Sequence, residues 1–172
     1  MSCDALESCR IRRVIALGCK AHHRDHFLYM ELHISDSANA KIGRVLRPAA
    51  DFIARGLATG ESVLVHCKAG ISRSATVILG YLLFHRRDLA PTLPAALALL
   101  REVRPCANPR PEFMLALEQL EAYLDLEAWS TPSSKMDERM TADAAAVVHV
   151  QRWWRQCLAQ RRVTEPTGTA WC

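Results

Sequence analysis

Apolar and polar positions along the chain follow two periods, and their succession predicts short strands connected by helices. Residues 4–10 indicate a short helix, and the apolar runs of residues 11–17 and 62–66 are typical of strands buried in a parallel sheet. A further strand is predicted from Phe27 to Ile34, where apolar residues alternate with other residues. These alternating positions are Leu28, Met30, Leu32 and Ile34.

Other segments have apolar residues at helical spacing. Residues 42–57 show it, but Pro48 interrupts them, so we expect a kink or two abutting helices. The run from Ala75 to Phe84 is apolar almost all round, which predicts the buried axis of the domain, and Gly80 within it indicates close packing against a neighbour. The charged residues 85–88 are expected at a solvated helix end. Two later helices are predicted, one over residues 93–103 with Thr92 as its cap and one carrying Phe113, Leu117, Leu120 and Leu124.

Composition narrows the class of protein. The chain has 172 residues, half of them hydrophobic, which suits one compact domain with an appendage. It contains no apolar run long enough to span a membrane, and its first residues do not resemble a signal peptide. Seven irregularly spaced cysteines suit a reducing compartment, so we expect a cytoplasmic location, with the nucleus left open. The net charge of +4 slightly favours phosphorylated or acidic ligands and gives no specific indication of nucleic acid.

The stretch between the strand at 62–66 and the buried helix predicts an anion site. Cys67 follows the strand directly, and small residues separate it from Arg73 at the start of the helix. A tight turn at this point directs main-chain N–H groups inward, and the helix start adds the positive end of its dipole. The residues predicted to line the anion are Lys68, Ala69, Gly70, Ile71 and Ser72.

The residue types in this stretch suit phosphoryl transfer. Helix N-termini and nearby cations lower the pKa of a cysteine from about 8.5 to about 3.5–7.5, so Cys67 is expected to be a thiolate near neutral pH. The planar guanidinium of Arg73 can bind two phosphate oxygens at once, and the Ser74 hydroxyl can stabilise the sulfur as a leaving group. The alternative, a buried and inert cysteine, does not explain the whole combination. No metal or cofactor is needed for this chemistry.

The string from His66 to Ser74 resembles the protein tyrosine phosphatase signature, His-Cys-x5-Arg, in the form found in dual-specificity phosphatases. The resemblance extends over residues 5–126 and includes residues 34–37, the Arg104-Pro105 segment and Phe113. It implies an α/β fold with a mostly parallel central sheet, helices on both sides, and a phosphate-binding loop between the central strand and the buried helix. The family has one or two strands ahead of the first helix that are absent here, so we expect either that the sequence is truncated at its N-terminus or that one sheet edge is exposed.

The resemblance also assigns roles outside the loop. A leaving alkoxide or phenoxide needs a proton, and Asp36 occupies the position of the family's general acid. An alternative or additional role for Asp36 is to cap a helix starting near Ala38. His66 is expected to support the loop. The family has a Pro-Asn pair where this chain has Pro109-Arg110, and Asn108 is the candidate for the missing support.

The family acts on phosphotyrosine and on phosphoserine or phosphothreonine through a phosphocysteine intermediate, and the resemblance implies this activity on a phosphoprotein substrate. Some relatives with the same signature act on phosphoinositides, glycan phosphates or RNA ends, and a pseudophosphatase scaffold is a further alternative.

The loop from Cys19 to His26 has a C-x2-H-H-x2-H spacing that could bind zinc. The sequence offers no second pair of ligands to complete the shell, so a solvated loop is the prediction and no metal site is expected.

The last part of the chain differs in composition. We expect a catalytic domain over residues 1–126, a linker over 127–139, an amphipathic helix over 140–162 and a disordered tail over 163–172. Residues 150–155 resemble the start of an IQ motif, which implies a calmodulin-like EF-hand partner on residues 150–161. Packing of this helix against the domain, or binding to a surface through its basic side, remain alternatives.

Overall fold

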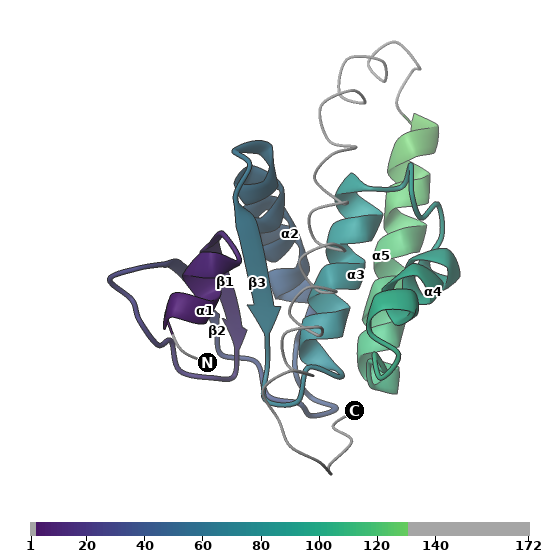
Figure 1. Ribbon diagram of the computed structural model, residues 1–172. Coiled ribbons are helices and arrows are strands. Elements are labelled where there is room, and N and C mark those ends of the chain that lie inside the picture. The colour runs from purple at the N-terminus through teal and green to yellow at the C-terminus, as the bar shows by residue number, and fades with distance from the viewer. Residues whose placement is uncertain (1–2, 131–172) are drawn as a thin grey trace.

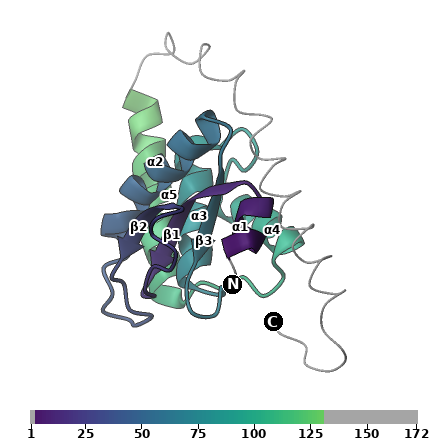
Figure 2. The ribbon, with the colours of Figure 1, turned by 60° about the vertical axis from the view of Figure 1, so that its left-hand side comes forward.

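The computed structural model of the protein describes residues 3–130, and its centre is a small parallel sheet. The strands are β1 (Ile11–Leu17), β2 (Leu28–Leu32) and β3 (Ser62–His66). Both neighbouring pairs are parallel, and β1 lies between β2 and β3 (Figure 2). The predicted α/β class is therefore confirmed, and within the described residues every strand pair is parallel.

Helices cover both faces of this sheet, as expected. The short helix α1 (Cys3–Ser8) lies on one side, and α2 (Gly43–Ala58) and α3 (Arg73–His85) lie on the other (Figure 1). The last two helices, α4 (Leu93–Val103) and α5 (Pro111–Ser130), pack on α3 and lie farther from the sheet. Thr92 caps α4 as predicted, since its hydroxyl accepts a hydrogen bond of 3.4 Å from the N–H of Ala95.

The register of the sheet divides its side chains between two cores. Ile15 pairs with Met30 on the face toward α2, where both belong to the main hydrophobic cluster. Val14 points to the other face and joins Leu6 and Phe27 in a small cluster beneath α1. Leu28 lies on the same side of β2 as Met30, as predicted, because its partner in register is Arg13, two residues before Ile15. At the start of the strand, however, Leu28 is 54% exposed.

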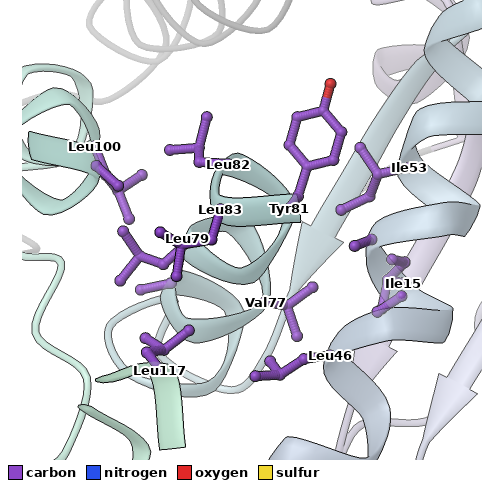
Figure 3. Packing of buried hydrophobic residues seen from close by; sticks show 14 of the residues in the cluster. Ile15, Leu46, Ile53, Val77, Leu79, Tyr81, Leu82, Leu83, Leu100 and Leu117 are labelled. Atoms are coloured by element: carbon purple, nitrogen blue, oxygen red, sulfur yellow. The ribbon is translucent and has the colours of Figure 1, made fainter. Parts of the chain in front are cut away.

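Helix α3 is the buried axis of the domain, as its apolar sequence predicts. It packs against α2, α4, α5 and β3, and Figure 3 shows its side chains between Ile53 of α2, Leu100 of α4 and Leu117 of α5. A Cβ atom at Gly80 would lie 3.2 Å from Leu46 Cδ2, which confirms the close packing expected at this glycine.

The segment around Pro48 forms a single helix. Pro48 lies within α2, in its second turn, so its missing N–H removes a hydrogen bond to Arg44 and leaves the following turns intact. The alternative of two abutting helices is wrong.

The charged end of α3 is the clearest departure from the expected burial. Arg86 is only 1% exposed, and its guanidinium donates to both carboxylate oxygens of Asp88 at 2.9 and 2.8 Å. The expectation of a fully solvated helix end is therefore wrong, because a two-point ion pair allows the arginine to be buried.

The described part of the chain ends with α5 at Ser130, beyond the predicted domain end at 126. No strand precedes α1 within residues 3–130, and β2 and β3 are the edges of the described sheet. No helix in this range is long and apolar enough to cross a membrane. The predictions for residues 131–172, including most of the linker, the IQ-like helix with its EF-hand partner, and the tail, lie outside the described residues.

Candidate active site

The candidate site lies where the three parallel strands end. The carboxyl ends of parallel strands meet at one edge of a sheet, and β3 points toward the loop that leads into α3 (Figure 1). This loop comprises residues 67–72 and is called the signature loop below. Asp36 follows β2 in a loop of its own, which we call the acid loop (residues 35–37).

Cys67 is surrounded by hydrogen-bond donors. The residue is 8% exposed, its Sγ accepts a hydrogen bond of 3.2 Å from the N–H of Gly70, and it lies 3.3 Å from the hydroxyl of Ser74. Burial acts on its pKa most strongly and raises it, but hydrogen bonding outweighs burial, so the pKa of Cys67 falls below its ordinary value. The groups responsible are the Ser74 hydroxyl and the main-chain N–H groups of Ser74, Gly70 and Ala69.

Arg73 is folded inward at the first position of α3. Its Nη1 donates to the carbonyl oxygens of Leu17 and Ile34, at 3.2 Å each, so the guanidinium is fixed to the end of β1 and to the segment just after β2. Its Nε lies 3.5 Å from Asp36 Oδ2, which is too long for a good hydrogen bond. This buried Nε has no hydrogen-bond partner within residues 3–130.

Gly18 makes room for this guanidinium, a role that the sequence does not indicate. A Cβ atom at Gly18 would lie 2.2 Å from Arg73 Nη1 and 2.8 Å from the carbonyl oxygen of Ile34. The φ angle of Gly18 is +62°, in the left-handed region where glycine is favoured. Gly18 therefore does more than end β1, because it permits the placement of Arg73.

Asp36 lies above the signature loop and is bound from several directions. The Ser72 hydroxyl donates to its Oδ1 at 3.0 Å, and Arg110 contacts both its carboxylate and its carbonyl oxygen. The side chain remains 39% exposed. The capping alternative is wrong, because α2 begins at Gly43, far past Ala38, and its cap residue is Ile42.

The outer side of the signature loop is supported by the segment before α5. Arg104 donates to the carbonyl oxygens of Gly70 and Ala69 at 3.2 Å each, and the N–H of Asn108 donates to the carbonyl of Ile71 at 2.9 Å. Asn108 thus contacts the loop through its main chain, while its side chain accepts a 3.5 Å hydrogen bond from Arg101. The resemblance included Arg104 without giving it a role.

The structure shows a contact and a backbone conformation that both favour glycine at position 70. Its φ angle is +68°, and a Cβ atom there would lie 2.9 Å from Arg104 Nη2. Glycine at this position therefore permits both the turn and the approach of Arg104.

The two remaining predicted residues lie on either side of Cys67. His66 ends β3 and is partly buried, and this burial lowers its pKa below the ordinary value of 6.5, so its imidazole is neutral at pH 7. Lys68 is exposed at the start of the loop.

The cysteine and histidine side chains of residues 19–26 do not come together as the C-x2-H-H-x2-H spacing would allow. Within residues 3–130, the one group of three close metal-ligand side chains is Cys3, Glu7 and His26, with their ligand atoms within 4.8 Å of one another. His26 Nδ1 lies 3.1 Å from Glu7 Oε1, which also describes an ordinary ion pair.

Comparison with known proteins identifies the family. The family model for the dual specificity phosphatase catalytic domain matches residues 1–123. The chain belongs to this family. Dual specificity protein phosphatase 1-B of Xenopus laevis is 36% identical to this dual-specificity phosphatase domain over 123 residues, which is 70% of this chain and 32% of that protein. The chain thus spans about a third of the length of this relative.

Solved structures have the same fold. The human tyrosine phosphatase-like serine/threonine/tyrosine-interacting protein superimposes with a TM-score of 0.65 at 29% identity, covering 71% of this chain and 83% of that one. Human DUSP28 gives a TM-score of 0.66 at 24% identity, covering 72% of this chain and 86% of that one. These structures support the arrangement of the sheet and helices described above.

Proposed function

We propose that this domain is a cysteine-dependent phosphatase that hydrolyses phosphotyrosine and phosphoserine or phosphothreonine in proteins. The proposal rests on the environment of Cys67. Its sulfur accepts a hydrogen bond from the N–H of Gly70 and lies 3.3 Å from the Ser74 hydroxyl, next to the helix that begins with Arg73. Donors aimed at the sulfur stabilise a thiolate, and a thiolate is the nucleophile that covalent phosphoryl transfer requires.

The first step transfers the phosphoryl group to the protein. The Cys67 thiolate attacks phosphorus in line with the ester oxygen, an S–P bond forms, and the P–O bond to the substrate breaks. Main-chain N–H groups of the signature loop and the guanidinium of Arg73 bind the non-bridging oxygens. The buried Nε of Arg73, which has no hydrogen-bond partner among the described residues, is a donor suited to one of these oxygens. Asp36, in its protonated form, gives its proton to the leaving oxygen.

The second step regenerates the thiolate. Asp36, now ionised, accepts a proton from a water molecule that attacks the phosphocysteine, and the S–P bond breaks to release inorganic phosphate. The Ser74 hydroxyl lies 3.3 Å from Cys67 Sγ and donates to the departing sulfur. Asp36 gives one proton to the leaving oxygen in the first step and takes one from water in the second, so it returns to its starting form.

Turnover of an aryl phosphate by the full chain, in the presence of a chelator, tests this proposal. We expect wild-type turnover to persist with the chelator and to fall to the background rate in Cys67→Ser, since a hydroxyl at this position is not ionised near neutral pH. Asp36→Ala should lose most of its activity and its acid–base profile should change. Turnover that survives Cys67→Ser would contradict the mechanism.

Two alternatives concern what the site binds. The human neighbour at 29% identity is described as a phosphatase-like interacting protein, which keeps a non-catalytic scaffold as the second candidate. A scaffold would bind a phosphopeptide without releasing phosphate from it. Phosphoinositides, glycan phosphates and RNA ends are tested as substrates in the same release assay, and a preference for one of them would replace the protein substrate.

The partner and location remain proposals from the sequence. We propose a calmodulin-like EF-hand partner for residues 150–161 and a cytoplasmic location for the protein. Capture of calmodulin by the full chain, with and without Ca2+ and with Trp154→Ala as the control, tests the partner. Equal capture by the variant would contradict it.

A further inference from the structure

Arg110 connects the start of α5 to the acid loop. Its Nη1 donates to the carbonyl oxygen of Asp36 at 2.5 Å and lies 3.8 Å from the Oδ1 of the same residue. The guanidinium itself is fixed, because its Nε donates to Glu112 at 2.8 Å and its carbon lies 5.9 Å from the ring centre of the fully buried Phe113. Contacts with residues of α5 therefore fix the orientation of the Arg110 side chain that contacts the acid loop.

A second connection runs through the main chain of Arg110. Its N–H donates to the hydroxyl of Ser72 at 3.3 Å, and the same hydroxyl donates to Asp36 Oδ1 at 3.0 Å. Ser72 is the residue just before Arg73, so this chain of hydrogen bonds joins α5, the signature loop and the acid loop. The side chain and the main chain of one residue thus bear on the same aspartate.

Asp36 depends on such contacts because it has little other support. It lies outside any strand or helix, in an exposed loop between β2 and α2. A general acid is effective only when its proton lies within hydrogen-bond reach of the leaving oxygen, and a misplacement of about 1 Å can reduce the rate about 100-fold. The contact to the carbonyl oxygen fixes the main chain of Asp36, and the contact through Ser72 orients its carboxyl group.

We propose that Arg110 is a positioning residue for Asp36 and thereby sets the rate on phosphoserine and phosphothreonine relative to phosphotyrosine. The inference rests on the proposed phosphatase function and on Asp36 as its acid. The phenol of tyrosine has a pKa of about 10, and an aliphatic alcohol is a far weaker acid. An alkoxide therefore leaves only if it receives a proton as the P–O bond breaks, whereas a phenoxide depends less on the acid.

The experiment measures kcat/KM of the full chain on three substrates. These are para-nitrophenyl phosphate, whose leaving group needs almost no proton, and two peptides of one sequence that carry phosphotyrosine or phosphothreonine. We expect Arg110→Gln to lower kcat/KM on the phosphothreonine peptide by about 10- to 100-fold, and on para-nitrophenyl phosphate by less than about 3-fold. The phosphotyrosine peptide should lie between them. Arg110→Lys, which keeps the charge, should recover part of the loss.

Three further variants make the result specific. In a background of Asp36→Asn, Arg110→Gln should have no additional effect, because the group that it positions no longer has a proton to give. Glu112→Gln weakens the hydrogen bond that holds the Arg110 guanidinium and leaves the charge of Arg110 unchanged. It should cause a smaller loss of kcat/KM, again largest on the phosphothreonine peptide and smallest on para-nitrophenyl phosphate. Arg55→Gln is the matched control, since Arg55 is exposed near the end of α2 and away from both loops.

The leaving-group dependence decides between roles for Arg110. An equal loss of kcat/KM on all three substrates would mean that Arg110 binds phosphate directly, and would overturn the inference. Additive losses in the double variant would overturn it as well. Absence of wild-type turnover on every substrate would instead overturn the proposed function, so the two failures are distinguishable.

Discussion

The signature loop and the acid loop are held in place in different ways. From Cys67 to Ser74, one continuous segment contains the proposed nucleophile, the main-chain donors around it, the cation and the hydroxyl. Asp36 is positioned by Ser72 and Arg110, which lie far from it in the sequence, and the same applies to Gly18 beside Arg73. Chemistry that is local in sequence can be predicted from a motif, whereas chemistry assembled across the fold depends on contacts that no motif contains.

The largest effect in this comparison is expected from Gly18, which is remote from the signature loop in sequence. Gly18→Ala should lower kcat/KM on an aryl phosphate by about 100-fold, because the new methyl group would occupy the place of Arg73 Nη1. Steady-state kinetics measure this loss. Gly60→Ala is the matched control, since Gly60 also has a positive φ, of +73°, but a Cβ atom there meets nothing within 4 Å. Equal activity in the two variants would show that Arg73 tolerates displacement.

A smaller effect is expected inside the signature loop, from Ser74. Its hydroxyl is one of the groups that lower the pKa of Cys67, so Ser74→Ala should raise that pKa. At slightly acidic pH, the fraction of Cys67 that is thiolate is then lower in the variant than in the wild type. At alkaline pH, Cys67 is fully ionised in both proteins. We expect alkylation of Cys67 by iodoacetamide to be about 10-fold slower near pH 6 and equal at high pH, which a pH series with mass spectrometry measures. Identical profiles would mean that the main-chain donors suffice.

The smallest effect on activity is expected at Asp88, outside both loops. Asp88→Asn should lower the free energy of unfolding by about 2 kcal/mol at pH 7, less than for a fully buried pair because Asp88 is 44% exposed. Turnover of the folded variant should equal that of the wild type. Chemical denaturation measures the change in stability.

The pH dependence of this loss follows from the direction of the pKa shift. The hydrogen bond from Arg86 lowers the pKa of Asp88 below its ordinary value of 3.8 in the folded state. Below that ordinary value the unfolded chain therefore binds the proton more readily, and the contribution of Asp88 is lost as the pH falls through the folded pKa. The difference in stability between wild type and variant should be complete at neutral pH and disappear in strong acid. A difference that stays constant into strong acid would contradict this account.

The hydrophobic pattern predicted much of the fold, and its error at the end of α3 has a clear cause. The strands, the buried character of α3 and the packing at Gly80 could be predicted because apolar periodicity reports which faces are buried. The burial of Arg86 could not, since it depends on a partner, Asp88, that lies beyond the end of the helix. The pattern identifies Arg86 as a charged residue, but its burial depends on the carboxylate that lies beside it in the folded chain.

By itself, the sequence determined the family, the α/β class and the group of residues around Cys67, because strand, turn and helix start are consecutive and their geometry is local. The tertiary structure decided what those residues face. It brought Gly18 beneath Arg73, Arg104 behind the signature loop and Arg110 against Asp36, joining segments that are distant in the chain. The physical reason is that hydrogen bonds and steric contacts act over a few ångströms, so positioning is decided by proximity in the folded chain.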